Sequence, residues 1–174
     1  MKVLDDNTLV EVWNNHGWGV SYVTDKITRT WQTSGVVKKI AFGELYEAMS
    51  FKGNRVLFEE NALLIKDNEV RARLDLPPLN EYSLDLKEMK ELLEQGDVEK
   101  IEDFLQYCSN MTLDAFVQVA IDLPVSNVSI VNLIGEYANV NVLAAIQEKM
   151  ENSLTNKDSS PNVNKPRPKR IIKE

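Results

Sequence analysis

The stretch LDLKEMKELLEQGDVEKIEDFLQYCSNMTLDAFVQVAIDLPVSNVSIVNLIGEYANVNVLAAIQEKM, residues 84–150, decides the fold of this chain. Turn residues divide it into four or five segments in which apolar residues recur every three or four positions, a spacing typical of helices that bury one face. The regular stripes are Val98, Ile101, Phe104, Leu105 and Cys108; Leu113, Phe116, Val117, Ala120 and Ile121; and Val142, Ala145, Ile146 and Met150. Helices of about 11 residues do not persist alone, so we expect a compact all-α array.

Capping residues mark the boundaries of these helices. Asp85 with Glu88 three residues later predicts a capping box. Gly96 is expected to end the first helix in a left-handed conformation, and Asp97 to cap the second. For the remaining helices, we expect Asn110 or Thr112 to cap the third, Pro124 to stop it, Ser126 or Asn127 to start the fourth, and Asn139 or Asn141 to precede the fifth.

The N-terminal part of the chain has strand character. The runs LVEVWN (9–14), WGVSYV (18–23), ITRTWQ (27–32) and VVKKI (36–40) are rich in β-branched and aromatic residues and are separated by turn signals. In the first run, Val10, Val12 and Asn14 alternate with residues of the opposite face. NNHG at 14–17 predicts a hairpin turn. Four short strands predict a small antiparallel sheet or a partly open barrel.

Short helices and one further strand are expected to cover this sheet. FGELYEAMS (42–50) predicts a helix that Gly53 breaks, ALLIKD (62–67) an added strand, and NEVRARLDL (68–76) a helix capped by Asp67. Pro77 and Pro78 cannot continue that helix. We therefore predict an α+β fold, with a small antiparallel β-rich domain at 1–79, a helical domain at 80–152 and an extended basic tail at 153–174.

The charge of the chain is distributed unevenly. Its 174 residues are 43% hydrophobic and 27% charged, which is a globular composition. The net charge of −7 opposes binding to nucleic acid or to an anionic membrane. Residues 81–154 hold fourteen acidic against four basic side chains, whereas residues 155–174 hold two against six. The helical domain is therefore acidic and the tail basic.

Targeting signals and disulfides are not expected. The N-terminus lacks the apolar core of a signal peptide, and no apolar run approaches the ~20 residues that span a bilayer. The single cysteine, Cys108, lies on an apolar stripe and cannot form an intramolecular disulfide. We expect a soluble protein with a buried structural thiol at this position.

The tail at 153–174 has three interpretations. Its composition cannot bury enough apolar surface to fold alone. It is a solubilising tail without a partner, a nucleic-acid anchor, or an arm that docks on an acidic surface with two isoleucines as apolar plugs. The acidity of the helical domain favours the arm over nucleic acid. The residues of this arm that would bind a partner are Lys165, Arg167, Lys169, Arg170, Ile171 and Ile172.

Catalytic and metal-binding signatures are missing from the sequence. The one histidine, His16, falls in the predicted turn, where we interpret it as an exposed turn residue. A zinc site takes about four ligands, and neither a glycine-rich phosphate loop nor a calcium-loop spacing occurs. We predict that the protein is not an enzyme and has no cofactor or metal.

Two features suggest nucleic-acid binding at first sight. Trp13, Trp18 and Trp31 crowd the predicted sheet, but a stacking platform for single strands needs a basic groove that this segment lacks. Core packing explains them better, and a tryptophan that stays exposed would mark a protein contact. Residues 126–151 could be drawn as a helix-turn-helix, but Lys149 is the only basic side chain there to meet phosphate.

The runs VEVWN, GVSYV, TRTWQ, KKIAFGEL and LLIKD, followed by EYSLDLKEMKELLEQGDVEKIEDFL and LIGEYANVNVLAAI, resemble small structural proteins encoded among the virion genes of tailed bacteriophages. The resemblance covers most of residues 9–150. It lies in apolar and turn positions, so it transfers no functional residue. IT-RTW replaces the more basic run expected there, and SNVSIVN is less charged than expected.

This resemblance implies a non-catalytic part of a phage particle, made in the cytoplasm of the bacterial host. It would be associated with the capsid or with the neck and tail. Its partners would be capsid, portal or tail proteins, or copies of itself. The alternative is an intracellular adaptor or regulator that binds a host protein or RNA polymerase through its acidic helices.

Overall fold

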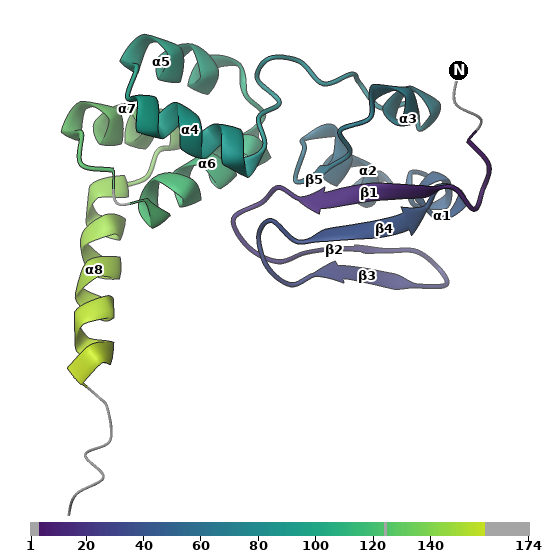
Figure 1. The fold of residues 1–174 in the computed structure, drawn as a ribbon, viewed down its shortest axis with the longest axis horizontal. Helices are drawn as coiled ribbons and strands as arrows, with labels where there is room; N and C mark the ends of the chain where they lie inside the picture. The colour runs from purple at the N-terminus through teal and green to yellow at the C-terminus, as the bar shows by residue number, and fades with distance from the viewer. Residues whose placement is uncertain (1–3, 124, 159–174) are drawn as a thin grey trace, which may run out of the picture.

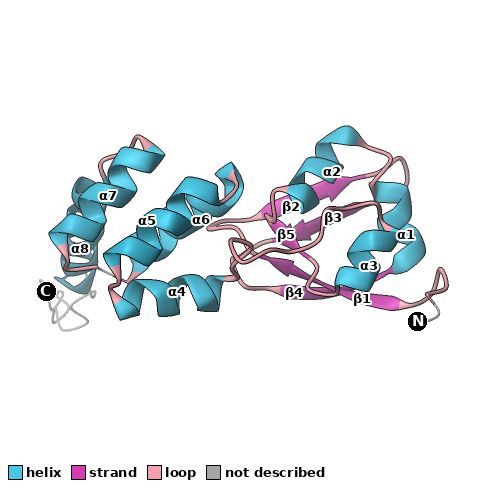
Figure 2. Ribbon diagram, turned by 90° about the horizontal axis from the view of Figure 1, so that it is seen from above, coloured by secondary structure: helices cyan, strands magenta, loops and turns pink. Residues whose placement is uncertain are grey.

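The computed structural model describes residues 4–123 and 125–158 and shows an α+β protein with two lobes (Figures 1 and 2). We call residues 4–79 the β lobe and residues 80–158 the helical lobe. The β lobe contains β1 (Leu9–Asn14), β2 (Val20–Val23), β3 (Thr28–Trp31), β4 (Val37–Ala41), α1 (Phe42–Ala48), α2 (Lys52–Glu59), β5 (Leu63–Leu64) and α3 (Asn68–Arg73). The helical lobe contains α4 (Leu86–Gln95), α5 (Val98–Tyr107), α6 (Asn110–Asp122), α7 (Val128–Ala138) and α8 (Val142–Asp158).

The strands form two antiparallel sheets. β1 lies between β4 and β5, and β2 pairs only with β3. The predicted antiparallel β-rich domain is confirmed, but it holds two sheets in place of the predicted sheet or partly open barrel, and the hairpin turn predicted at 14–17 is wrong because β1 and β2 do not pair. The Asn14 side chain supplies the reason, because its amide donates to the carbonyl oxygens of Trp18 and Thr33, each at 2.8 Å. These bonds hold the chain after β1 against the β3–β4 connection, so it does not turn back to pair with β1.

The alternation predicted for β1 is confirmed. Val10, Val12 and Asn14 are buried, whereas Leu9 on the opposite face is exposed. The buried face packs into a core around Tyr22 and Trp31, and the indole Nε1 of Trp31 donates to the carbonyl oxygen of Val12 at 3.1 Å. This core ends at Leu76, and a second core begins at Tyr82, so each lobe has its own interior.

One helix boundary in the β lobe differs from the prediction. Gly53 was expected to break a helix but lies inside α2, and the break falls instead between Ala48 and Lys52. A Cβ atom at Gly53 would meet nothing within 4 Å, so this glycine sits on an open helix surface. The predicted cap at Asp67 is confirmed, because its carboxylate accepts from the backbone N–H groups of Glu69 and Val70.

The helical lobe contains five helices, as predicted, and most of its predicted caps are confirmed. Asp85 and Glu88 form the capping box, Gly96 is left-handed with φ of 66°, and Asp97 caps α5. Asn127 caps α7, whereas Asn139 ends it in a left-handed conformation. Pro124 lies outside the described residues.

The cap of α6 is neither of the two predicted residues. Ser109 takes this position, since its hydroxyl oxygen accepts from the backbone N–H of Thr112 at 3.2 Å. Asn110 is the first residue inside the helix, and Thr112 is buried. The error is one residue in position and follows from three neighbouring polar residues that can all act as caps.

The predicted apolar stripes are mostly buried, with exceptions at their ends. Ile101, Phe116 and Ile146 are in the core, but Val98 is 40% exposed and Met150 is 49% exposed. Cys108 is half-buried, and desolvation raises the pKa of its thiol to about 11. α8 continues to Asp158, so the first six residues of the segment predicted as tail are helical.

Candidate protein-binding surface

The two lobes meet at a polar junction that fixes the helical lobe against the β lobe. The Ser109 hydroxyl donates to the carbonyl oxygen of Glu60 at 2.7 Å, and the Thr112 hydroxyl donates to the same oxygen at 3.3 Å. The Asn15 amide donates to the carbonyl oxygen of Leu84 at 2.9 Å. Together these bonds satisfy backbone carbonyls of both lobes, which would be costly to leave unpaired at a buried junction.

His16 lies at this junction, so the prediction of an exposed turn residue is wrong. It is only 6% exposed, and its ring meets that of Trp18 edge-on with centroids 4.3 Å apart. The adjacent Gly17 abuts Gln118 of α6 so closely that a Cβ atom would lie 2.7 Å from the Cβ of Gln118. Burial lowers the pKa of His16 and outweighs the opposing charge of Asp114. The imidazole is therefore neutral at pH 7 and belongs to the packing between the lobes.

The three tryptophans have different environments. Trp31 is fully buried in the β-lobe core, as the core-packing interpretation predicted, so of the three possible aromatic contacts it offers no surface to a partner. Trp13 is half-buried, and the ammonium of Lys66 lies 4.6 Å from its ring centroid. Trp18 is 56% exposed. Of the three, Trp18 has the largest free surface for a partner.

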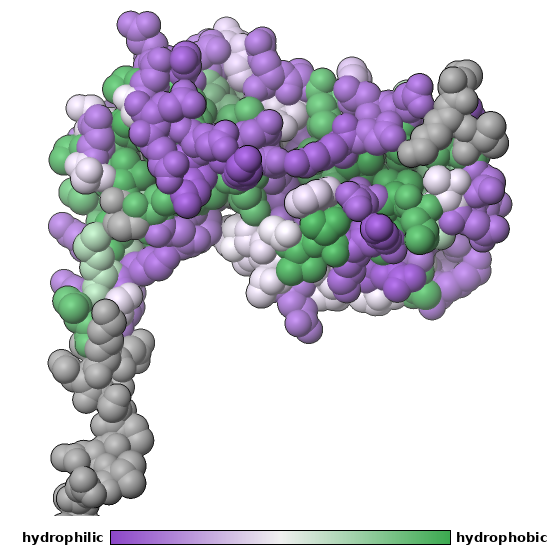
Figure 3. Space-filling view, in the orientation of Figure 1, coloured by the Kyte–Doolittle hydropathy of each residue, from purple (hydrophilic) through white to green (hydrophobic). Residues whose placement is uncertain are grey.

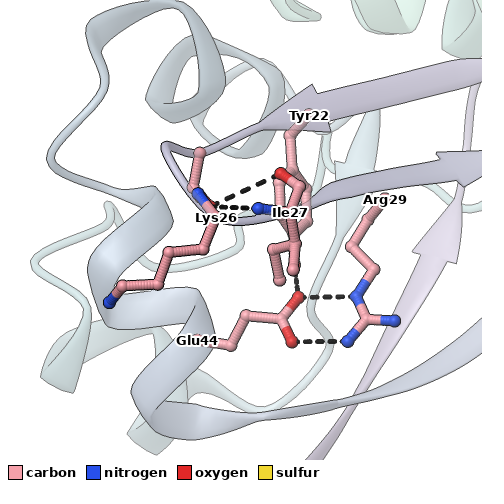
Figure 4. A network of polar contacts seen from close by, with 6 residues as sticks. Tyr22, Lys26, Ile27, Arg29 and Glu44 are labelled. Carbon is pink, nitrogen blue, oxygen red and sulfur yellow. Dashed lines mark hydrogen bonds and ion pairs between the residues drawn. The ribbon is translucent and has the colours of Figure 1, made fainter.

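A hydrogen-bonded ion pair fastens the β2–β3 hairpin to α1 (Figure 4). The Arg29 guanidinium donates through Nε and Nη2 to the two carboxylate oxygens of Glu44, both at 2.7 Å. The Tyr22 hydroxyl also donates to Glu44. The hydrogen bonds from Arg29 hold the pKa of Glu44 below its usual value, although partial burial opposes this shift. Tyr22 and Arg29 both bond to Glu44 of the same lobe, which is typical of a structural role.

The helical lobe presents a strongly acidic surface. All four lysines of residues 81–154 form ion pairs with acids of the same lobe: Lys87 with Glu91, Lys90 with Glu94, Lys100 with Asp97, and Lys149 with Asp122. Ten further acids remain without a lysine or arginine of that segment to balance them. Glu99, Glu102 and Asp114 are among the exposed ones. Figure 3 shows the hydrophilic cover over α4 and α5.

An apolar groove lies between α6 and α8. It has a volume of about 430 Å³ and is lined by Ile121, Asp122, Ile146, Lys149, Met150, Ser153 and Leu154. On α8, the stripe Val142, Ile146, Met150, Leu154 begins buried, at 2% and 4% exposure, and ends uncovered, at 49% and 66%. The stripe predicted from the sequence ends at Met150. Leu154, four residues later, is the signal that would have extended it.

The predicted arm residues Lys165, Arg167, Lys169, Arg170, Ile171 and Ile172 lie outside the described residues. Within residues 4–123 and 125–158, no group of three or more His, Cys, Asp or Glu side chains is placed to hold a metal ion. Over the same residues, no single helix is long and apolar enough to cross a bilayer, and only α7 joined to α8 through a 113° bend reaches that length and composition.

The chain has no match among protein-family models, curated proteins or solved structures. The resemblance of its apolar and turn pattern to phage virion proteins therefore stays a prediction.

Proposed function

We propose that this protein is a non-catalytic structural protein of a tailed-phage virion that binds capsid or neck and tail proteins. The observation that carries the proposal is the acidic helical lobe with an uncovered apolar groove between α6 and α8. The helical lobe and the basic segment at 159–174 are the proposed binding elements. We name a phage particle as the assembly because the sequence resembles virion proteins.

The chemistry of this surface suits a protein partner with a basic segment. Exposed acids of one sign steer a basic partner and reject acidic ones. An apolar patch next to them supplies contact area that releases water on binding. Trp18, in the loop against α6, adds an aromatic side chain of the type that is enriched in binding hot spots.

The same surface opposes nucleic-acid binding by the helical lobe. Its four lysines are each within 4 Å of an acid of the lobe, and acids outnumber them by ten. A polyanion gains affinity by releasing counterions to basic side chains, which this lobe does not offer. We therefore place the protein at a protein–protein contact in the particle.

The test is the composition of particles purified on a density gradient from cells that make the phage. We expect the protein in a fixed ratio to the capsid or tail proteins. Absence from gradient-purified particles would overturn the proposal. A pull-down that then returns one soluble host protein, with no particle proteins, would support the adaptor or regulator alternative instead.

A charge-reversal pair tests the acidic surface itself. Glu99→Lys with Glu102→Lys reverses two exposed acids of α5, and Asp25→Lys with Glu69→Lys is a control on the exposed surface of the β lobe. Glu99 and Glu69 both lie in the first turn of a helix, so both pairs remove one favourable dipole contact. We expect the α5 pair to lower incorporation into particles several-fold more than the control pair. Equal incorporation would remove the acidic surface from the proposal.

A further inference from the structure

We propose that the groove between α6 and α8 is the receptor for the segment Lys165–Lys173 of a neighbouring copy of this chain. The inference rests on the proposed function, since a virion protein acts in many copies, and it names the partner of the groove. Each copy would then offer one groove and one arm. The contact would be head-to-tail, because two different surfaces meet in it.

The uncovered half of α8 needs a partner. The helix leaves the helical lobe and projects away from it (Figure 1), and its residues after Ile146 face α6 at Ile121 and Asp122, across the open groove. Helical segments of about 12 residues are marginal in water without tertiary packing. Met150 and Leu154 continue the buried stripe of the same helix but are 49% and 66% exposed. A segment that covers these two side chains would complete the stripe.

The small size of the apolar patch favours a short peptide segment over a folded surface as the occupant of the groove. A stable contact between two folded surfaces buries at least about 1,000 Å², and a pair of side chains on one helix cannot supply this in a symmetric α8–α8 dimer. Adjacent side chains of an extended peptide point to opposite sides, so a peptide with two adjacent apolar residues turns one of them toward Met150 and Leu154 in either register. Ile171 and Ile172 are the only adjacent pair of large apolar residues after Leu154.

The charges around the groove also match the arm. Asp122 lies on the rim, paired with Lys149, and Glu151 is exposed on α8 next to Met150. Residues 159–174 carry five basic side chains against one acid. A basic peptide in this groove therefore meets acids of the helical lobe.

The chain is long enough to reach another copy. Ile171 comes thirteen positions after Asp158, and an extended chain of that length spans about 45 Å. Pro161, Pro166 and Pro168 fall within this segment, and prolines favour extended, semi-rigid spacers over tight reversals. The arm is therefore better suited to cross to a neighbour than to fold back along the helix that it follows.

A complementation experiment tests the arrangement in the full chain. Met150→Glu with Leu154→Glu destroys the groove and keeps the arm, whereas Ile171→Glu with Ile172→Glu destroys the arm and keeps the groove. Sedimentation of the unchanged protein should show self-association that weakens by about tenfold or more in either double variant, because each replaces the apolar side chains of one partner by carboxylates. Mixing the two variants should restore a complex of one copy of each, with no larger species.

Matched controls carry the same added charge. Leu143→Glu with Ala144→Glu alters α8 at two exposed residues outside the groove, and Ser159→Glu with Ser160→Glu adds two acids to the arm without removing the isoleucines. Both controls should associate more tightly than the double variants, and circular dichroism should show that all variants are folded.

Three outcomes would overturn the inference. They are a concentration-independent monomer of the unchanged protein, equal association of the double variants and their controls, and failure of the mixed variants to pair. Each of these can occur while the protein is still found in particles, so failure of this inference is distinguishable from failure of the proposed function.

Discussion

Ser109 in the helical lobe donates its hydroxyl hydrogen to the carbonyl oxygen of Glu60 in the β lobe, across 2.7 Å. The same hydroxyl oxygen accepts from the backbone N–H of Thr112 and so begins α6. One side chain thus caps a core helix and joins the two lobes. The start of α6 is therefore coupled to the end of α2.

Ser109→Ala should lower the free energy of unfolding by about 1–3 kcal/mol, because it removes a helix cap and leaves a buried carbonyl with one fewer donor. Asn127→Ala is the matched control, since Asn127 caps α7 at an exposed position. The control should cost about 0.5–1 kcal/mol. Urea denaturation followed by circular dichroism measures both. Equal costs for the two variants would mean that the bond to Glu60 adds nothing.

The caps show what local sequence can and cannot predict. Asp85, Asp97 and Asn127 were correctly predicted because a helix cap is set by residues within one turn of each other. Ser109 was missed because neighbouring polar residues can also act as caps, and the bond that distinguishes it joins Glu60, 49 residues earlier. Contacts at that separation leave no periodic signal in a single sequence.

Two glycines should respond to alanine in opposite directions. Gly96 has a φ of 66°, which an alanine adopts only with strain, so Gly96→Ala should destabilise the protein by about 1 kcal/mol. Gly53 lies inside α2 with nothing within 4 Å of a new Cβ, so Gly53→Ala should stabilise it by about 0.5–1 kcal/mol. Thermal melting of both variants measures the difference. A loss of stability in Gly53→Ala would indicate that the chain bends at this position.

The ion pair between Arg29 and Glu44 should make stability depend on pH. The pKa of Glu44 is lower in the folded protein than the ordinary value of 4.5, so its contribution is present above about pH 4.5 and is lost as the pH falls through the folded pKa. Glu44→Gln removes the charge and should lower stability at pH 7. The difference from the unchanged protein should shrink as the pH falls below about 4.5 and through the folded pKa.

Chemical denaturation at several pH values measures this effect. Glu148→Gln is the control, because Glu148 is exposed on α8 and shows no ion pair among the described residues. Its stability difference should stay small throughout. A Glu44→Gln difference that is constant from pH 7 to pH 3 would contradict the role assigned to the carboxylate.

The error at His16 and the choice left open for each tryptophan have the same physical origin. These positions were judged from neighbouring residues, but their burial is decided by segments distant in the sequence. His16 is covered at the junction with α6, and Trp31 is held by a hydrogen bond to Val12. The exposure of Trp18 was likewise not predictable, because the residues around each of the three tryptophans support the same interpretation. Surface assignments therefore need the fold, whereas the helices and strands follow from local pattern.

Phe116 tests the assignment of the helical core most directly. It is fully buried on α6, and its ring lies 4.8 Å from that of Phe104 on α5. Phe116→Ala should cost about 3–5 kcal/mol of unfolding free energy, and Ile146→Ala about 2–5 kcal/mol, because each removes buried apolar contacts and leaves a cavity. Denaturant titration at fixed pH measures both.

An aromatic residue on the same lobe provides the control. Tyr107 on α5 is 55% exposed, so Tyr107→Ala should cost about 1 kcal/mol or less, beyond its stacking on Tyr82. The ratio of the two costs matters more than either value, since both changes truncate an aromatic ring to a methyl group. If Phe116→Ala were as mild as Tyr107→Ala, α6 would not be the helix around which the lobe packs. The groove between α6 and α8 would then not be bounded by a firmly packed helix on its α6 side.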